Sequence, residues 1–319
     1  MNARDPRFAA ELARAVHGEV KQAAPLARFS TYRIGGPATV FLPASAEDLA
    51  EGLRHAAGAG VPVFPIGLGS NVLLPDGGLD ALVIRIGKGL DRVRSDGERW
   101  WFGAGLPAPL AARKTAAEGW AGLHMMVGVP GSVGGGVYMN AGCHGGQWSD
   151  VTVAVTTVDR SGGSRIIPAA RIPFRYRQSG LGADIVVEAE VRLRAGDRAE
   201  LDREVEHLFD WRQKGTPFNQ PCCGSVFKNP DSPAPAGWLR PWTAGSLIEA
   251  AGLKGSRAGG AEISPMHANY FVNTGQATAA DVRALIATAR ATVADRFGVV
   301  LETEVKVIGA LGEYLPPDP

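Results

Sequence analysis

GVPGSVGGGVYMNAGCHGG, residues 128–146, concentrates small residues and contains no Asp, Glu, Lys or Arg. Glycine loses more conformational entropy on folding than any other residue, so this run indicates either disorder or a partner that only bare backbone can approach. A solvated linker would not carry its apolar members, Val129, Val133, Val137, Tyr138 and Met139. The stretch therefore predicts an ordered loop whose backbone lies against a flat or phosphorylated ligand.

A second glycine-containing loop lies in PIGLGSNVLL, residues 65–74. Its apolar flanks predict a strand, a tight turn at Gly67 and Gly69, and a second strand. Consecutive N–H groups in such a turn bind anions, and Ser70 and Asn71 add hydrogen bonds suited to a pyrophosphate. The loop has neither the Lys-Ser/Thr pair of a Walker loop nor the third glycine of a dinucleotide fingerprint. A purely structural turn stays open, but the two loops together favour a dinucleotide cofactor over a nucleotide that is hydrolysed.

The composition is that of a globular protein of two or three domains, with 319 residues, 45% hydrophobic and 20% charged. With a formal net charge of +1, the protein has no overall positive potential that would attract nucleic acid or an anionic membrane. Cys143, Cys222 and Cys223 form no zinc or disulfide pattern, and the histidines show no metal-ligand spacing. The amino terminus lacks the apolar core of a signal peptide. We therefore expect a soluble cytoplasmic protein with no metal, nucleic-acid or membrane partner.

Strand and helix patterns alternate in the first third of the chain. Ser45 predicts the cap of a helix that runs to about residue 58, with acidic residues in its first turn. Asp96-Gly97 predicts a hairpin turn between ALVIRIG, residues 81–87, and RWWFGAG, residues 99–105. We therefore expect a small α/β unit here.

The middle of the chain has the pattern of strands closed by a helix. Period-2 alternation predicts strands within residues 151–168, with a turn at Ser161–Gly163, and within residues 184–194. Residues 197–214 predict the closing helix. Its apolar residues at helical spacing are Leu201, Val205, Leu208 and Phe209.

The last third combines short extended pieces with two helices. CCGSVFKNP, residues 222–230, and VVLETEVKVIG, residues 299–309, predict strands, and residues 244–252 predict a short helix. A longer helix starts at Thr278 with a capping-box pattern and can end at Gly298. Its predicted apolar face comprises Val282, Leu285, Ile286, Ala289, Val293 and Phe297.

Several polar residues in these segments have both a chemical and a structural interpretation. In a strand, Ser225, Phe227 and Asn229 share one face and can meet a substrate, although an isolated serine is usually only a satisfied hydroxyl. No G-x-S-x-G elbow surrounds Ser225, so a serine hydrolase is disfavoured. Arg177 in FRYRQS can hold a carboxylate bidentately or pair on the surface. Glu302, Glu304 and Lys306 alternate with apolar residues, which by itself is typical of a half-solvated edge strand.

The ordered set of motifs resembles the UDP-N-acetylenolpyruvoylglucosamine reductase (MurB) family over residues 29–309. The sequence AEISPMHANYFVN, residues 261–273, resembles the shorter class of that family, which lacks a tyrosine-bearing segment over the substrate. The motifs that carry the resemblance are STYRIGGPA, PIGLGSNVLL, GVPGSVGGGVYMNAGCHG, FRYRQS, CGSVFKNP, AGSLIEAAGLKG, HANYFVN and GVVLETEVKVIG.

The resemblance implies an α+β protein with a two-domain FAD-binding fold of the vanillyl-alcohol oxidase (PCMH) type and a third, α/β substrate-binding domain. The expected division is 1–87 and 88–215 for the two FAD-binding subdomains, 216–299 for the substrate-binding domain, and 300–319 for a strand and tail that return to the FAD-binding part. A monomer is expected.

The resemblance also implies the activity of a UDP-N-acetylmuramate dehydrogenase, working in the direction of reduction. NADPH reduces FAD, which reduces the enolpyruvyl group of UDP-N-acetylglucosamine enolpyruvate to UDP-N-acetylmuramate for peptidoglycan, the cell-wall polymer. An FAD-dependent alcohol oxidase or dehydrogenase on the same fold would not need Arg177, Ser225 and Glu304 together, and a non-catalytic flavin- or UDP-sugar-binding sensor should have lost one of them. Their joint presence favours the reductase.

The family pattern assigns site residues by position. Ser225 is the expected proton donor, with Arg177 and Glu304 binding and polarising the substrate carboxylate. Glu304 must then be protonated or act through water, so its pKa is expected to be raised. The substrate-binding candidates are Lys214, Lys228, Asn229, His267 and Asn269. The FAD-binding candidates are Tyr32, Ile66, Gly67, Leu68, Gly69, Ser70, Asn71, Gly128, Pro130, Gly131, Ser132, Gly134, Gly135, Asn140, Ala141 and Gly142.

Two features depart from the family pattern. The loop DSPAPAGWLRPW, residues 231–242, is longer than the usual link after FKNP, which bears on how the substrate is covered. Cys222 and Cys223 directly precede Gly224-Ser225 and are either a redox-sensitive pair or a buried pair of small apolar residues, of which the second is favoured.

Overall fold

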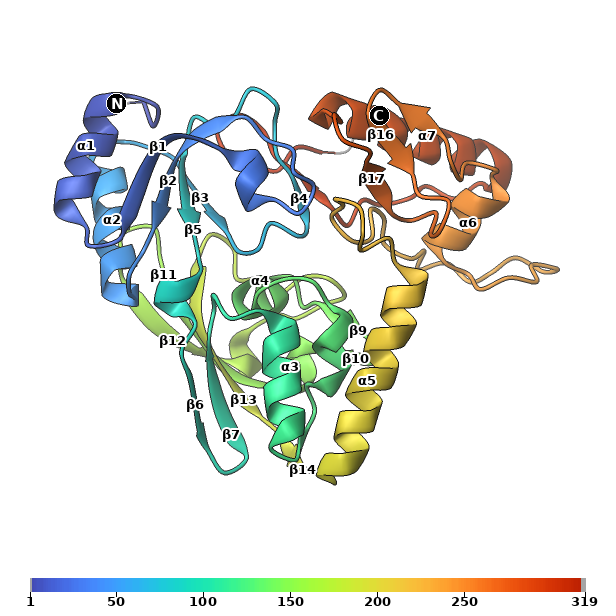
Figure 1. Ribbon diagram of the computed structural model, residues 1–319, viewed down its shortest axis with the longest axis horizontal. Coiled ribbons are helices and arrows are strands. Elements are labelled where there is room, and N and C mark those ends of the chain that lie inside the picture. The colour runs from blue at the N-terminus through green and yellow to red at the C-terminus, as the bar shows by residue number, and fades with distance from the viewer. Residues whose placement is uncertain (1, 317–319) are drawn as a thin grey trace. The chain divides into compact units, whose positions relative to one another are not determined.

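The computed structural model describes residues 2–316 and divides the chain into two compact units. Unit 1 comprises Met1–Ala24, Ala38–Leu68 and Asp80–Arg212. Unit 2 comprises Pro25–Pro37, Gly69–Leu79 and Gln213–Pro319. Both units mix helices with short sheets (Figure 1), as expected of an α+β protein.

The first sheet of unit 1 has the strand order β1-β2-β5-β3. β5 pairs in parallel with both β2 and β3, so it is buried on both faces. Helix α2 follows Ser45, whose hydroxyl accepts the Asp48 N–H, as predicted, and it lies beside α1 (Figure 1). The bounds are α1 Pro6–Ala15, β1 Glu19–Pro25, β2 Pro37–Leu42, α2 Ala46–Gly58, β3 Val63–Ile66 and β5 Leu82–Arg85.

The second sheet is antiparallel, in the order β12-β11-β13-β7-β6. The predicted turn at Asp96-Gly97 is confirmed, because Asp96 pairs with Arg99, but the predicted first strand of that hairpin is wrong. ALVIRIG forms β5 of the other sheet, where its parallel pairing suits a continuous apolar run that is buried on both faces. The bounds are β6 Val93–Asp96, β7 Arg99–Gly103, β11 Thr152–Val158, β12 Ser164–Pro168 and β13 Ile185–Arg192.

Three helices of the middle segment pack on unit 1, and Figure 1 shows α3 and α4 near β7 and β13. Helix α5 buries Leu201 and Val205, as the helical spacing predicted. The helices are α3 Ala108–Ala117, α4 Val133–Tyr138 and α5 Arg198–Gly215, and the short strand pairs are β8 Trp120–Ala121 with β14 Arg194–Ala195, and β9 Gly142–Cys143 with β10 Gly146–Gln147. One-turn 3-10 segments are η1 Leu26–Phe29, η2 Lys88–Leu90, η3 His124–Gly128, η4 Trp148–Asp150 and η5 Ala169–Arg171.

In its described residues unit 2 contains the helices α6 and α7 and two small sheets, and Figure 1 shows α7 beside β16. The predicted capping box of α7 is confirmed by reciprocal bonds between Thr278 and Asp281, and Gly298 ends the helix at φ +67°. The predicted apolar face is buried, with Phe297 partly buried. The bounds are β4 Val72–Leu73, α6 Ala244–Ala250, β15 Arg257–Ala258, β16 Ala261–Ile263, β17 Phe271–Asn273, α7 Ala279–Phe297 and β18 Lys306–Val307.

The two long strands predicted at 222–230 and 299–309 are much shorter than expected. They pair with each other only at Phe227 and Thr303, and β18 is the regular part of the second. The Val226 carbonyl accepts the N–H groups of both Glu304 and Val305, so a bulge interrupts the ladder. Both Val226 and Phe227 are buried, which rules out the simple alternation predicted for Ser225, Phe227 and Asn229.

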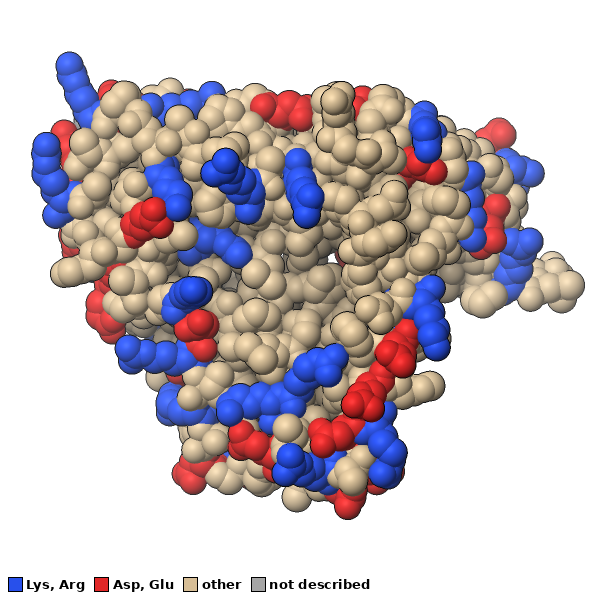
Figure 2. Space-filling model, viewed as in Figure 1, with Lys and Arg blue, Asp and Glu red and all other residues tan. Residues whose placement is uncertain are grey.

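Basic and acidic side chains are interspersed on the face that Figure 2 shows, as a net charge of +1 leads one to expect. Within residues 2–316, the helices are too short or too polar to cross a membrane.

Candidate functional site

The two glycine-rich loops of unit 1 lie against each other at Gly67 and Ser132. A Cβ atom added at Gly67 would lie 2.5 Å from the Ser132 Oγ. Ser132 is buried, and its hydroxyl accepts the Gly135 N–H to cap α4. A Cβ at Gly134 would lie 2.7 Å from the Ala104 Cβ, so this glycine lets α4 pack closely. The stretch at 128–146 is therefore ordered, and close packing requires glycine at position 134.

Unit 2 holds the rest of the first loop, Gly69–Asn71, from two sides. The Gly69 carbonyl accepts the Thr31 N–H at 3.1 Å, and the Cys223 thiol donates to the Val72 carbonyl at 3.0 Å. On the other side, the Asn71 amide donates to the Glu304 carbonyl at 3.1 Å. Gly69 itself has φ +66°, which favours glycine. The loop is thus tied to the segments that carry Ser225 and Glu304.

The predicted cofactor residues fit FAD chiefly through their backbone. The close approach of Gly67 and Ser132 forms a cradle that a side chain at Gly67 would fill. Six of the nine members that are half-buried or exposed are glycine, alanine or serine, whose small side chains leave the backbone open to close approach. These members are Gly67, Leu68, Ser70, Asn71, Pro130, Gly131, Gly135, Ala141 and Gly142.

Other predicted cofactor residues have buried side chains. Tyr32 is fully buried in the core of unit 2, and its hydroxyl has no hydrogen-bond partner among residues 2–316. Burial, with Cys223 and Cys222 nearby, raises the pKa of Tyr32 well above its usual value. Asn140 is 1% exposed. The other buried members of this set are Ile66, Gly69, Gly128, Ser132 and Gly134. The side chains of Tyr32 and Asn140 therefore contribute to packing and hydrogen bonding inside the protein.

In unit 2 the backbone brings Ser225 and Glu304 onto neighbouring segments. The Val226 carbonyl accepts the Glu304 N–H at 2.8 Å, and the Glu302 carbonyl accepts the Lys228 N–H at 2.9 Å. The side chains of Lys228 and Glu302 form an ion pair. Ser225 and Glu304 are both half-buried. The arrangement places a hydroxyl, two carboxylates and an ammonium group on one pair of segments.

Lys306 adds a second ammonium group to this cluster. Its backbone N–H donates to the Asn71 carbonyl at 3.0 Å, and its Nζ lies 5.7 Å from the centre of the Tyr314 ring. Burial and then the charge of Lys228 lower the pKa of Lys306, against the opposing effect of Glu302 and Glu304. Lys306 and Glu302 were not among the predicted site residues, although the alternation in ETEVK already placed them with Glu304 on one side.

The predicted substrate residue Asn269 is a structural support of the Ser225 segment. Its Oδ1 accepts the Phe227 N–H at 2.9 Å, and its Nδ2 donates to the Phe227 carbonyl at 2.8 Å. His267 Nδ1 accepts the Asn269 N–H, and its ring contacts Tyr270. Asn229 is exposed and its Oδ1 accepts the Ala244 N–H at the start of α6. Lys214 is exposed near the end of α5.

Arg177 belongs to unit 1 and has a strained backbone, with φ +57°. Its Nη2 donates to the Gly142 carbonyl at 3.0 Å, and its guanidinium lies 4.7 Å from the centre of the Tyr176 ring. Arg175 and Gln178 exchange backbone hydrogen bonds around this turn. A non-glycine residue in the left-handed region is often found at functional sites, where surrounding contacts maintain it.

Cys223 is 1% exposed, whereas Cys222 is partly exposed. Burial raises the pKa of Cys223 to about 12, so this thiol stays protonated at neutral pH. The interpretation as a buried small residue therefore holds for Cys223. Among residues 2–316, no group of three or more His, Cys, Asp and Glu side chains is arranged to hold a metal ion.

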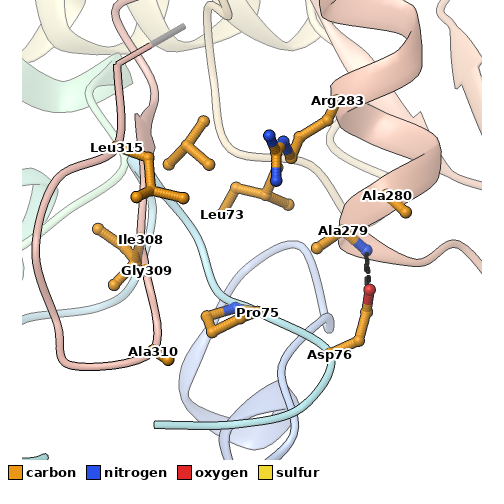
Figure 3. Close-up of a pocket in the computed structure, with 11 residues that line it drawn as sticks. Leu73, Pro75, Asp76, Ala279, Ala280, Arg283, Ile308, Gly309, Ala310 and Leu315 are labelled. Atoms are coloured by element: carbon orange, nitrogen blue, oxygen red, sulfur yellow. Dashed lines mark hydrogen bonds between the residues drawn. The ribbon is translucent and has the colours of Figure 1, made fainter. Parts of the chain in front are cut away.

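A pocket of about 230 Å³ in unit 2 lies apart from these residues (Figure 3). It is mostly apolar, and Asp76 at its edge accepts the Ala279 N–H at 2.9 Å, which caps α7. Arg283 is its basic lining residue. The described residues that line it include none of the predicted site residues.

Two protein families match consecutive parts of the chain. Residues 37–166 match the FAD binding domain family. Residues 216–308 match the family described as UDP-N-acetylenolpyruvoylglucosamine reductase, C-terminal domain. The fold is thus an FAD-binding fold of the PCMH type followed by the C-terminal domain of these reductases, as predicted.

Individual relatives match over nearly their whole length. A UDP-N-acetylenolpyruvoylglucosamine reductase of Halalkalibacterium halodurans is 41% identical over 295 residues, 92% of this chain and 95% of that protein. A second, from Bacillus anthracis, is 39% identical and covers 94% and 98%. The crystal structure of the Thermus caldophilus MurB enzyme superposes with a TM-score of 0.76 at 32% identity, covering 91% of this chain and 99% of that one. The chain therefore belongs to the UDP-N-acetylenolpyruvoylglucosamine reductase (MurB) family, FAD-dependent oxidoreductases of peptidoglycan precursor synthesis.

Proposed function

We propose that this chain uses NADPH to reduce the enolpyruvyl group of UDP-N-acetylglucosamine enolpyruvate, giving UDP-N-acetylmuramate. The observation that supports this best is the backbone pairing of residues 225–228 with residues 302–304, which places a hydroxyl, two carboxylates and an ammonium group on neighbouring segments. When bound, FAD accepts hydride from NADPH and supplies it to the β carbon of the enolpyruvyl group. The residues of this chain must then stabilise the negative charge and provide a proton.

Ser225 is the proposed proton donor to the α carbon. Addition of hydride at the β carbon leaves enolate character at the α carbon, conjugated with the substrate carboxylate, and only protonation completes the reaction. The hydroxyl is half-buried and lies on a segment whose backbone is braced by Asn269 and Glu304.

Arg177 and Glu304 are the proposed partners of the substrate carboxylate. The planar guanidinium of Arg177 suits a bidentate carboxylate, and the Gly142 carbonyl orients it through one Nη2 hydrogen. Glu304 helps a developing dianion only when it is protonated or acts through a water molecule. Lys306 interacts electrostatically with both Lys228 and Glu304. The two ammonium groups add positive potential for the diphosphate or the developing enolate.

The remaining assignments follow the family positions. The backbone of Gly67–Asn71 and of the half-buried members of 128–142 would hold FAD. Lys214, Asn229 and His267 are proposed for the UDP-sugar, and Asn269 bonds the backbone of Phe227, two residues before Asn229. We also propose that the chain is a cytoplasmic monomer of the class that lacks the tyrosine-bearing segment.

Oxidation of NADPH by the purified, FAD-loaded chain tests the proposal. Without oxygen, and beyond the one equivalent that reduces the bound FAD, NADPH should be consumed only when the enolpyruvyl sugar nucleotide is present, with one product lactyl ether formed for each NADPH. An alcohol oxidase would instead reduce its flavin with an alcohol and without NADPH. A fully flavin-loaded chain that leaves the enolpyruvyl substrate unchanged would contradict the proposal.

A further inference from the structure

The end of the glycine-rich stretch is tied to the turn that carries Arg177 by three hydrogen bonds. The Tyr138 carbonyl accepts the Ser179 N–H at 3.1 Å. The Asn140 Nδ2 donates to the Arg175 carbonyl at 3.0 Å, and the Gly142 carbonyl accepts from the Arg177 Nη2 at 3.0 Å. Residues 140, 142 and 138 thus hold the turn before, at and after its left-handed residue, respectively.

Asn140 is the only one of the three that acts through its side chain, and that side chain is fully used. Its Nδ2 also donates to Gln147 Oε1 at 3.2 Å, and its Oδ1 accepts the Ser149 N–H at 2.9 Å. Both amide hydrogens are therefore engaged within unit 1. The residue is 1% exposed and has φ +43°, a conformation that asparagine tolerates better than most residues.

These contacts do not suit a residue whose side chain binds a ligand. A buried amide with both hydrogens bonded inside the protein has no donor to offer a flavin ring or a pyrophosphate. By contrast, they suit a brace, because a left-handed residue such as Arg177 persists only where its surroundings determine its conformation. The bond from Asn140 to the Arg175 carbonyl lies two residues from that strained position.

We propose that Asn140 is a positioning residue for Arg177, coupling the glycine-rich cofactor stretch to the group that binds the substrate carboxylate. This inference rests on the proposed function of Arg177. Asn140 holds the Arg175–Gln178 turn, and the Gly142 carbonyl two residues further on orients the guanidinium. Cofactor stretch and carboxylate-binding group therefore form one hydrogen-bonded unit.

The test uses two substitutions that keep the left-handed backbone accessible. Asn140→Asp keeps the shape of the side chain and the acceptor for the Ser149 N–H. It sets a carboxylate oxygen against the backbone carbonyl oxygen of Arg175 and the side-chain Oε1 of Gln147. Asn140→Gly removes the whole side chain without straining φ. Gln147→Ala is the matched control, because it removes the Asn140–Gln147 bond and leaves the bond to Arg175 intact.

Both Asn140 variants should raise the KM for the enolpyruvyl substrate about 10- to 100-fold, the size of one charge-assisted hydrogen bond. FAD affinity and the rate of flavin reduction by NADPH should stay within about threefold of wild type. Gln147→Ala should change the KM far less. In an Arg177→Ala background, Asn140→Asp should add no further increase in KM, since the group it positions is gone. Equal effects in both backgrounds, or a loss of FAD affinity with an unchanged KM, would overturn the proposal.

Hydrogen exchange of the FAD-free protein provides a readout without turnover. Asn140→Gly should speed exchange at Ser149 and across residues 174–181, whereas Asn140→Asp should speed it across 174–181 and spare Ser149. Unchanged exchange across 174–181 in both variants would refute the brace. Failure of the proposed function would be distinct, because the wild-type chain would then leave the enolpyruvyl substrate unreduced while the exchange result stood by itself.

Discussion

Two asparagines brace the two halves of the proposed chemistry in different ways. Asn140 in unit 1 holds a turn whose Arg177 has φ +57°, and the tie is made at a single carbonyl. Asn269 in unit 2 replaces two missing ladder bonds beside a bulge, by bonding both the N–H and the carbonyl of Phe227. The first supports a strained conformation near the surface, and the second supports an extended segment in a core. In both regions a side-chain amide completes the backbone hydrogen bonding at a point where regular secondary structure is interrupted.

The largest expected effect separates the two halves by their chemistry. Ser225→Ala should slow reduction of the enolpyruvyl substrate by about 10²- to 10⁴-fold, because this half-reaction alone needs a proton donor. Flavin reduction by NADPH should remain nearly unchanged. Stopped-flow measurement of the two half-reactions checks this. If both half-reactions slow equally, Ser225 is not the proton donor, and the two regions do not differ in this chemical role.

The next effect separates them by stability. Asn269→Ala should lower the free energy of unfolding by about 2–4 kcal/mol, because it leaves the buried N–H and carbonyl of Phe227 unpaired. Denaturant titration of the FAD-loaded protein measures it. Asn229→Ala is the control, since Asn229 is exposed and makes one bond to the Ala244 N–H. Equal losses in the two variants would show that Asn269 is not a structural brace.

The smallest effect tests how closed the core beside Ser225 is. Burial raises the pKa of Cys223 to about 12 from a usual value of 9.0, so the unfolded chain loses the thiol proton first as pH rises. The contribution of this thiol to the free energy of unfolding should therefore be complete below pH 9 and be lost as the pH rises from 9.0 towards about 12. Cys223→Ala should remove this part of the pH dependence. An identical slope in both proteins would indicate that water reaches the thiol.

Much of the architecture was predicted because its signals are local. The caps at Ser45 and Thr278, the end at Gly298, the turn at Asp96-Gly97 and the apolar face of α7 each depend on residues a few positions apart. The same holds for the two glycine-rich loops, whose composition already excluded a solvated linker.

The supports of the site were not predicted, because their partners are distant in sequence. Asn140 bonds a carbonyl 35 positions away, and Asn269 bonds a residue 42 positions away. Tyr32 matches a family motif, yet its ring lies in the core of unit 2. Periodicity likewise gave no sign of the bulge at Val226, which depends on two N–H groups from the far end of the chain.

The sequence by itself determined the family and where helices such as α2 and α7 begin, since ordered motifs carry the first and local hydrogen bonding decides the second. Only the tertiary structure decided which polar side chains are buried and brace the backbone through hydrogen bonds. The physical reason is that a buried amide, carbonyl or thiol must find a partner, and long-range packing alone selects that partner.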